Sequence, residues 1–375
     1  MAVKRSLGAD LAGASRLAME AVTGVTELVE AVHMNVLNKA IGTPVVRPVA
    51  GVTAFVYRSV KGVTRLVGGG IDVMLGRLVP VLDEPTAWPG REALVAALNG
   101  VLGDRLSASG NPLAIQMGWR MPSTAPSGRI LVLAHGLCMN DLQWLRDGVD
   151  HGATLAQERG YTPVYLRYNS GRHISHNGRE FAQQLEALVD DWPVPVTELV
   201  IIGHSMGGLL ARSACHYGSQ AGHGWLAHLS KIVFLGTPHQ GAPLERGGNW
   251  VHLLTDLSVY SKPFSRLAKI RSAGITDLRH GSVLDDDWVD QDRFAHGKAP
   301  PPLALPAGVR CYAIAATVGK REGDAADRLL AGDGLVPVAS ALAGHADLER
   351  HVVCQTNHMQ LLSSKQVSDK LLAWL

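Results

Sequence analysis

The residues best suited to chemistry in this 375-residue chain form the stretch Gly203-His204-Ser205-Met206-Gly207. An apolar run, 199–202, precedes it and a helical pattern follows, so Ser205 is predicted at a tight turn between a buried strand and a helix. The glycines beside the serine permit a strained turn that lifts its hydroxyl out of a sheet, where bulkier residues would collide. Ser205 is therefore our candidate nucleophile for attack on an acyl carbonyl.

In this strand–turn–helix context the chain resembles the α/β-hydrolase superfamily, and more narrowly its bacterial lipase and esterase branch, over about residues 112–375. A strand that ends in His135-Gly136-Leu137 matches the same branch. The resemblance implies an oxyanion hole formed by the backbone N–H groups of Leu137 and Met206. His135 itself is interpreted as a structural residue of the loop.

The resemblance also implies the partners of the serine. Asp333, between two glycines in a turn after the strand 311–317, is the expected triad acid, and His358, after the last predicted strand, is the expected general base. The competing acids in the same loop are Glu322, Asp324 and Asp327, which are interpreted as the start of a solvated helix. The competing histidines are His345 and His351. A Gly-Thr-Pro-His turn at 236–239 also resembles the branch and is expected to shape the floor of the site.

Short apolar runs must position these residues. They are rich in Val and Ile and lie at 130–134, 163–166, 199–202, 232–235, 311–317 and 352–354. Helical segments such as 178–191 and 207–217 separate them, and this alternation predicts a mostly parallel sheet with helices on both faces. The interval 241–306 breaks the alternation and is predicted to be an inserted helical cap. Its Leu253, Leu254 and Leu257 could face substrate or could cover the core.

Residues 1–110 are predicted to be a helical accessory region, followed by a catalytic α/β-hydrolase domain over 111–375. Valines spaced by three and four residues mark two amphipathic helices before residue 70, and a further helical stretch surrounds residues 94–102. Arg58, Lys61 and Arg65 form a basic stripe on the second helix. We favour a helical layer packed on the core; the alternative is a peripheral surface that contacts anionic lipid.

Composition excludes several classes of protein. The formal charge is +2, with 46% hydrophobic and 18% charged residues, which predicts a folded protein without a nucleic-acid partner. The four cysteines are widely spaced and are expected to be ordinary, mostly buried thiols. No apolar run of signal-peptide length forms within the first ten residues, and no stretch is apolar enough to cross a bilayer, so we expect a cytoplasmic protein. The acidic run 285–287 is interpreted as a solvated turn, and no metal or cofactor is expected.

The sequence thus predicts a serine hydrolase that cleaves carboxylic esters, a lipase or esterase with a hydrophobic ester or acyl substrate. The alternatives are an acyltransferase or thioesterase that uses the same Ser205, Asp333 and His358, or an inactive α/β-hydrolase scaffold that only binds.

Overall fold

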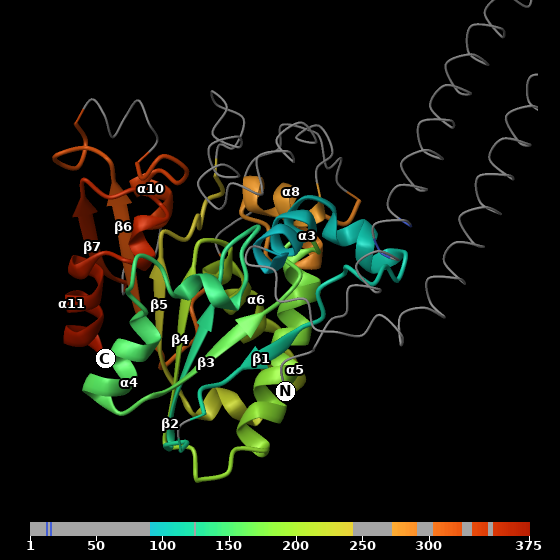
Figure 1. Cartoon of the computed structure of the whole chain (residues 1–375), viewed down its shortest axis with the longest axis horizontal. Helices are drawn as coiled ribbons and strands as arrows, with labels where there is room; N and C mark the ends of the chain where they lie inside the picture. Colours follow the sequence, from blue (N-terminus) through green and yellow to red (C-terminus); the bar gives the residue numbers. More distant parts are fainter. Residues whose placement is uncertain are drawn as a thin grey trace, which may run out of the picture. The chain divides into compact units, whose positions relative to one another are not determined.

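The computed structural model describes residues 13, 16, 91–123, 125–242, 272–290, 303–324, 332–343 and 348–375. Within these ranges one seven-stranded sheet dominates the fold, in the order β1-β3-β2-β4-β5-β6-β7 (Figure 1). The strands are β1 (Gly118–Arg120), β2 (Arg129–Ala134), β3 (Thr162–Arg167), β4 (Glu198–His204), β5 (Leu229–Leu235), β6 (Arg310–Thr317) and β7 (Glu349–Cys354).

All pairings in the sheet are parallel except that of β1 with β3. The mostly parallel sheet predicted from the sequence is therefore confirmed, and each of the six predicted runs forms one of its strands. β1 was not predicted, because three half-buried residues give no periodic pattern. The central strands β2 and β4 are almost entirely buried, as expected of parallel strands covered on both faces.

The register of the parallel strands brings several loops to one edge of the sheet. The last residue of β2, Ala134, pairs with Gly203 of β4, and His204 pairs with Leu235 at the end of β5. On the other side, Thr317 of β6 pairs with Cys354 of β7. Since parallel strands all run in the same direction, the loops that follow them gather at their carboxyl ends, which is where open α/β sheets bind ligands.

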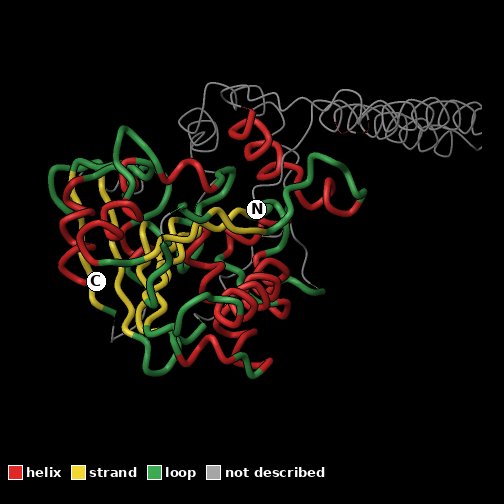
Figure 2. Tube along the Cα trace, turned by 60° about the horizontal axis from the view of Figure 1, so that its bottom comes forward, coloured by secondary structure: helices red, strands yellow, loops and turns green. Residues whose placement is uncertain are grey.

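Helices cover both faces of this sheet (Figure 2). α5 (Ile174–Asp190) packs along α6 (Met206–Ala221), and α4 (His151–Arg159) packs beside α11 (Lys365–Trp374). Short 3-10 turns complete the layers: η1 (Asp141–Trp144), η2 (Gly224–Ala227), η4 (Asp285–Asp287) and η5 (Gln360–Leu362). α10 (Val338–Ala341) contacts β6. The core between the layers contains fully buried aromatic rings such as Trp144, Phe181, Trp225 and Phe234.

The helix α3 (Arg91–Ala108) belongs to the same compact unit as the sheet up to Ser107, although it falls within the predicted accessory region 1–110. The thiol of Cys138 faces the carbonyl oxygen of Ala97 at 3.8 Å, and the side-chain amide of Asn169 donates to the carbonyl of Gly103 at 2.9 Å. Residues 3–88 and 108–114 form a second compact unit, in which the Asn111 amide donates to the carbonyl of Gly13.

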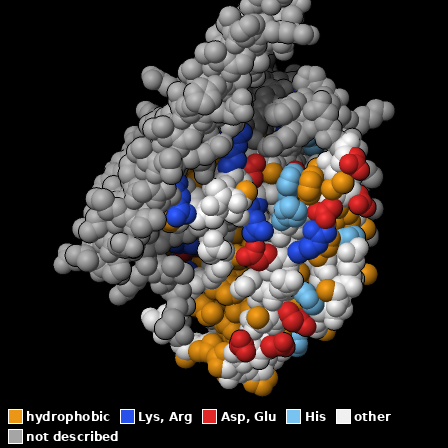
Figure 3. Space-filling model, turned by 90° about the vertical axis from the view of Figure 1, so that its right-hand side faces the viewer, with side chains coloured by type: hydrophobic (Ala, Val, Ile, Leu, Met, Phe, Trp, Pro, Cys, Tyr) orange, Lys and Arg blue, Asp and Glu red, His pale blue; other side chains and the backbone are white. Residues whose placement is uncertain are grey.

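The described part of the predicted cap, 272–290, contains α8 (Ala273–His280) and η4. It is fixed to the start of α5, because the ring of Trp288 stacks on His173 at 3.7 Å and its indole N–H donates to Ser175. The carboxylate of Asp285 in η4 pairs with Arg179. On the face of the molecule seen in Figure 3, histidine side chains lie beside hydrophobic ones, and basic and acidic side chains are interspersed.

Several predictions concern residues outside the described ranges. These are the two valine helices, the basic stripe of Arg58, Lys61 and Arg65, the leucines at 253, 254 and 257, the competing acid Asp327, and His345. In the part of the chain that the structure describes, no helix combines the length and the hydropathy that a membrane crossing requires.

Candidate active site

Ser205 has an unusual backbone conformation at the junction of β4 and α6. Its φ of 54° and ψ of −122° lie in a region that residues other than glycine rarely adopt, which costs about 1–3 kcal/mol. The N–H of Ser205 donates to the carbonyl of Leu235 on β5 at 2.8 Å, and its own carbonyl accepts from Gly208 at 3.1 Å. The surrounding structure therefore holds the serine in the strained turn predicted from the sequence.

The two glycines of the motif are required by close packing. A Cβ added at Gly203 would overlap the backbone of Gly208 in the first turn of α6, and one added at Gly207 would overlap the carbonyl oxygen of Ala134. Neither clash could be relieved by rotating a flexible side chain, since the opposing atoms belong to the backbone. This packing brings the start of α6 against the loop that follows β2.

His358 and Asp333 are in direct contact. Nδ1 of His358 lies 2.7 Å from Oδ2 of Asp333, and the N–H of His358 donates to the carbonyl of Asp333 at 3.0 Å. A carboxylate only accepts, so Nδ1 carries the proton and Nε2 keeps a free lone pair. The side chains are buried, with relative exposures of 4% for His358 and 1% for Asp333.

The turn around Asp333 locks the carboxylate. Oδ1 accepts from the backbone N–H groups of Leu335 at 3.0 Å and Val336 at 2.8 Å, so that Oδ2 faces His358. Gly332 and Gly334 both have positive φ, as the turn requires. Of the competing acids, Asp324 instead accepts from the backbone N–H of Lys320 at 2.8 Å. The segment 321–324 forms bends and turns, and the rest of the predicted helix start, 325–328, lies outside the described residues.

The loop after β2 lies against the serine. A Cβ placed on Gly136 would stand 3.1 Å from Cβ of Ser205, and Leu137 follows directly. In the described part of the chain, the N–H of Leu137 donates to no protein acceptor, while Met206 opens α6, where the first N–H groups have no partner inside the helix. Both predicted oxyanion donors are thus backbone groups beside Ser205.

His135 holds this loop in place through contacts with Gly136 and Tyr168. Its ring stacks on Tyr168 with centroids 4.3 Å apart, and Nδ1 lies 2.8 Å from the carbonyl oxygen of Gly136. The Tyr168 hydroxyl donates to the carbonyl of His135 at 2.8 Å. Complete burial lowers the pKa of His135 to about 4, so the ring is neutral at pH 7. These contacts place His135 in the support of the loop.

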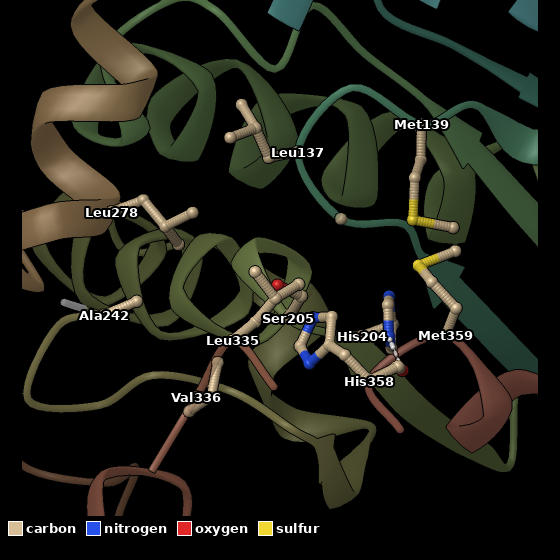
Figure 4. A pocket seen from close by; sticks show the side chains of 11 residues that line it. Leu137, Met139, His204, Ser205, Ala242, Leu278, Leu335, Val336, His358 and Met359 are labelled. Carbon is tan, nitrogen blue, oxygen red and sulfur yellow. Dashed lines mark hydrogen bonds between the residues drawn. The ribbon is translucent and has the colours of Figure 1, made fainter. Parts of the chain in front are cut away.

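Ser205 and His358 open into one pocket (Figure 4). Apart from these two, His204 and Gly136, the described residues that line it are apolar: Leu137, Met139, Ala242, Leu278, Leu335, Val336 and Met359. Leu278 comes from α8, and the N–H of Ala242 donates to its carbonyl at 3.1 Å, so the start of the predicted cap and its helix α8 both line the pocket of the serine. No sequence pattern indicated Leu278 as a lining residue, because it lies more than 70 positions from Ser205.

The turn at 236–239, which was predicted to shape the floor of the site, lies close to His358. A Cβ added to Gly236, whose φ is 57°, would approach the ring of His358 to 3.2 Å and overlap Leu361. His239, the last residue of this turn, is buried, and Nη1 of the buried Arg212 donates to its Nδ1 at 2.8 Å. The sequence motif quoted for this turn gave no indication of that buried pair.

Among the described residues there is no cluster of three or more side chains with the arrangement of a metal site. Cys138, Cys215 and Cys311 are buried and Cys354 is partly buried, all with free thiols. Burial raises the pKa of Cys138 to about 12, which makes this thiol, next to the loop of Leu137, a poor nucleophile.

Comparisons with known proteins were made for the whole chain. Residues 126–304 match the family model described as a PGAP1-like alpha/beta domain, a range that contains Ser205 and ends before Asp333. No curated protein matches significantly.

Among solved structures, the mature lipase BlEst2 of Bacillus licheniformis is 17% identical, with 68% of this chain and 98% of that chain covered and a TM-score of 0.45. A lipase-esterase related protein of Clostridium acetobutylicum is 14% identical over 70% of this chain and 100% of its own, with a TM-score of 0.41. Phospholipase PlaB of Legionella pneumophila is 14% identical over 66% and 59%, with a TM-score of 0.44. These identities are too low to carry a substrate from those proteins to this chain.

Proposed function

We propose that this chain is a serine hydrolase of the α/β-hydrolase superfamily that cleaves carboxylic esters through an acyl-enzyme intermediate. The observation that carries the proposal is the 2.7 Å contact between Nδ1 of His358 and Oδ2 of Asp333, next to a serine held at a strained turn. A buried His–Asp pair beside a serine at the carboxyl end of a strand is the arrangement that activates a hydroxyl for acyl transfer.

The first half of the reaction forms the acyl-enzyme. Nε2 of His358 takes the proton of the Ser205 hydroxyl while Oγ attacks the ester carbonyl. The backbone N–H groups of Leu137 and Met206 bind the negative charge that develops on the carbonyl oxygen. The carbon–oxygen bond to the alcohol then breaks, and His358 returns its proton to the departing alkoxide.

The second half releases the acid. Nε2 of His358 deprotonates a water molecule, which attacks the acyl carbonyl bound to Ser205. Collapse of the tetrahedral species breaks the bond to Oγ, and the proton on His358 restores the serine hydroxyl. Asp333 keeps the Nδ1 proton in place throughout and stabilises the imidazolium that forms in each half.

The apolar lining of the pocket favours an uncharged hydrocarbon acyl group. The described side chains that line it from the loop after β2, from α8 and from the Asp333 turn bear no charge, so a carboxylate or ammonium group beside them would be desolvated without an oppositely charged partner among the described residues. We therefore expect esters of neutral acyl chains to be hydrolysed in preference to esters of acids that carry a second charge.

A hydrolysis profile tests this function. Chromogenic esters from acetyl to palmitoyl, with a lipid emulsion beside them, should show turnover that depends on acyl length, and a succinate half-ester of the same alcohol should react much more slowly. Matched thioesters and added alcohol acceptors separate the alternatives. Thioester turnover without ester turnover, or acyl transfer without hydrolysis, would replace the proposed activity, and no turnover of any acyl donor would favour the binding scaffold.

A further inference from the structure

His204 is a second imidazole within the candidate site. It is the last residue of β4, directly before Ser205, and it is 1% exposed. Its ring centroid lies 4.8 Å from that of His358, and both rings reach the same pocket (Figure 4). The role of this histidine is not explained by the reaction above, which uses only one imidazole.

The protonation of His204 follows from its contacts. Nε2 lies 3.1 Å from the backbone carbonyl oxygen of His358, and a carbonyl can only accept, so Nε2 carries the proton. Nδ1 is buried and has no hydrogen-bond partner among the described residues. Burial, together with the nearby His358, holds the pKa of His204 well below its ordinary value, so the ring is neutral at pH 7.

The two ring nitrogens of His204 contribute differently. The unpartnered Nδ1 costs about 1–3 kcal/mol, whereas the Nε2–H pairs with the carbonyl oxygen of the buried His358. An apolar side chain at position 204 would leave that carbonyl without this donor, so the Nε2 bond is the contribution that only a hydrogen-bonding side chain can make.

The Nε2 bond connects His204 to the segment that carries His358. His358 lies in the short loop between β7 and η5, and its backbone is held at two points. Its N–H donates to the carbonyl of Asp333, and its carbonyl accepts from His204. The first bond ties the loop of the base to the acid, and the second ties it to the residue next to Ser205.

We propose that His204 is a positioning residue: its Nε2–H bond to the carbonyl of His358 fixes the distance between the imidazole of His358 and the hydroxyl of Ser205. The inference rests on the proposed serine-hydrolase function. A displacement of about 1 Å at a reacting pair can cost about 100-fold in rate, so one backbone hydrogen bond between the two segments is enough to matter.

Two amide variants separate this role from simple packing. The side-chain nitrogen of glutamine reaches the position of Nε2, whereas that of asparagine reaches only the position of Nδ1. We expect His204→Gln to keep kcat within about 3-fold of the native value, and His204→Asn to lower kcat by about 10- to 100-fold. KM for a short ester should change by less than about 3-fold in both, since the bond holds the base and not the substrate.

Two further measurements keep the test independent of the ester. The rate of inactivation by a fluorophosphonate should fall in the same order, and the downfield proton resonance of His358 Nδ1 should persist in His204→Gln and exchange faster in His204→Asn. Equal losses of kcat in both variants that track their melting temperatures would overturn the proposal, as would native kcat in His204→Asn. If the native protein neither hydrolyses esters nor reacts with the phosphonate, the proposed function fails, and the His358 resonance still decides the role of His204.

Discussion

Replacement of Asp333 by asparagine changes one atom and tests the acid directly. Oδ1 accepts two backbone N–H bonds, from Leu335 and Val336, so the amide oxygen of the variant must remain on that side. Its NH₂ group then faces Nδ1 of His358, at the position where Oδ2 lies 2.7 Å away in the native protein. An NH₂ group donates, which forces Nδ1 to accept and moves the imidazole proton to Nε2.

The cost follows from that tautomer. A protonated Nε2 cannot take the proton from Ser205, and the imidazolium loses its carboxylate. We expect kcat to fall by about 10⁴-fold, which corresponds to about 5.5 kcal/mol of transition-state stabilisation. KM should change little, because Asp333 does not line the pocket. The circular dichroism spectrum should be retained, since the shape of the side chain and both turn bonds are kept.

Steady-state kinetics on one short ester is the assay, with Asp324→Asn as the matched control. Asp324 lies in the same connection after β6, but its carboxylate caps the turn at Lys320. The control should keep kcat within about 2-fold, as expected of a residue that contacts no reacting group. More than a tenth of native kcat in Asp333→Asn, or a large loss confined to Asp324→Asn, would refute the assignment of the acid.

Two further predictions concern stability. Gly207→Ala should lower the free energy of unfolding by about 3 kcal/mol or more, because its Cβ would overlap the carbonyl of Ala134. The control Gly118→Ala has open space around it and should cost less than about 1 kcal/mol. Equal denaturant midpoints for the two variants would contradict the packing. The pKa of His135 falls from 6.5 to about 4 on folding, so the unfolded chain takes up the proton at a higher pH than the folded one. The free energy of unfolding should therefore drop by about 3 kcal/mol as the pH falls from 6.5 to 4. Urea titrations at these two pH values should show a smaller drop for His135→Gln.

The sheet could be predicted because its strands are short, apolar and buried on both faces, so each one stands out from the helical segments around it. The same pattern located Ser205, whose flanking glycines mark the turn at the end of β4. β1 was missed because three half-buried residues carry no such signal. α4 was not predicted either, since only three of its nine residues are buried and they form no long apolar stripe.

The contacts of the site required the structure. The pattern Gly-Asp-Gly suggested Asp333, but only the turn geometry reveals that Oδ1 is locked by two N–H groups while Oδ2 faces His358. The bond from His204 to the carbonyl of His358 joins residues 154 positions apart. Such pairings depend on the order of the strands in the sheet, and local sequence does not encode that order.

The most direct test of the central claim is the reaction of the full-length chain with a fluorophosphonate, read by intact mass and peptide mapping. We predict one adduct, on Ser205, and loss of ester hydrolysis in proportion to labelling. Ser205→Ala should take up no label and lose about 10³-fold or more of its kcat while remaining folded. An adduct on a different serine, or hydrolysis by Ser205→Ala above a tenth of the native rate, would contradict the account.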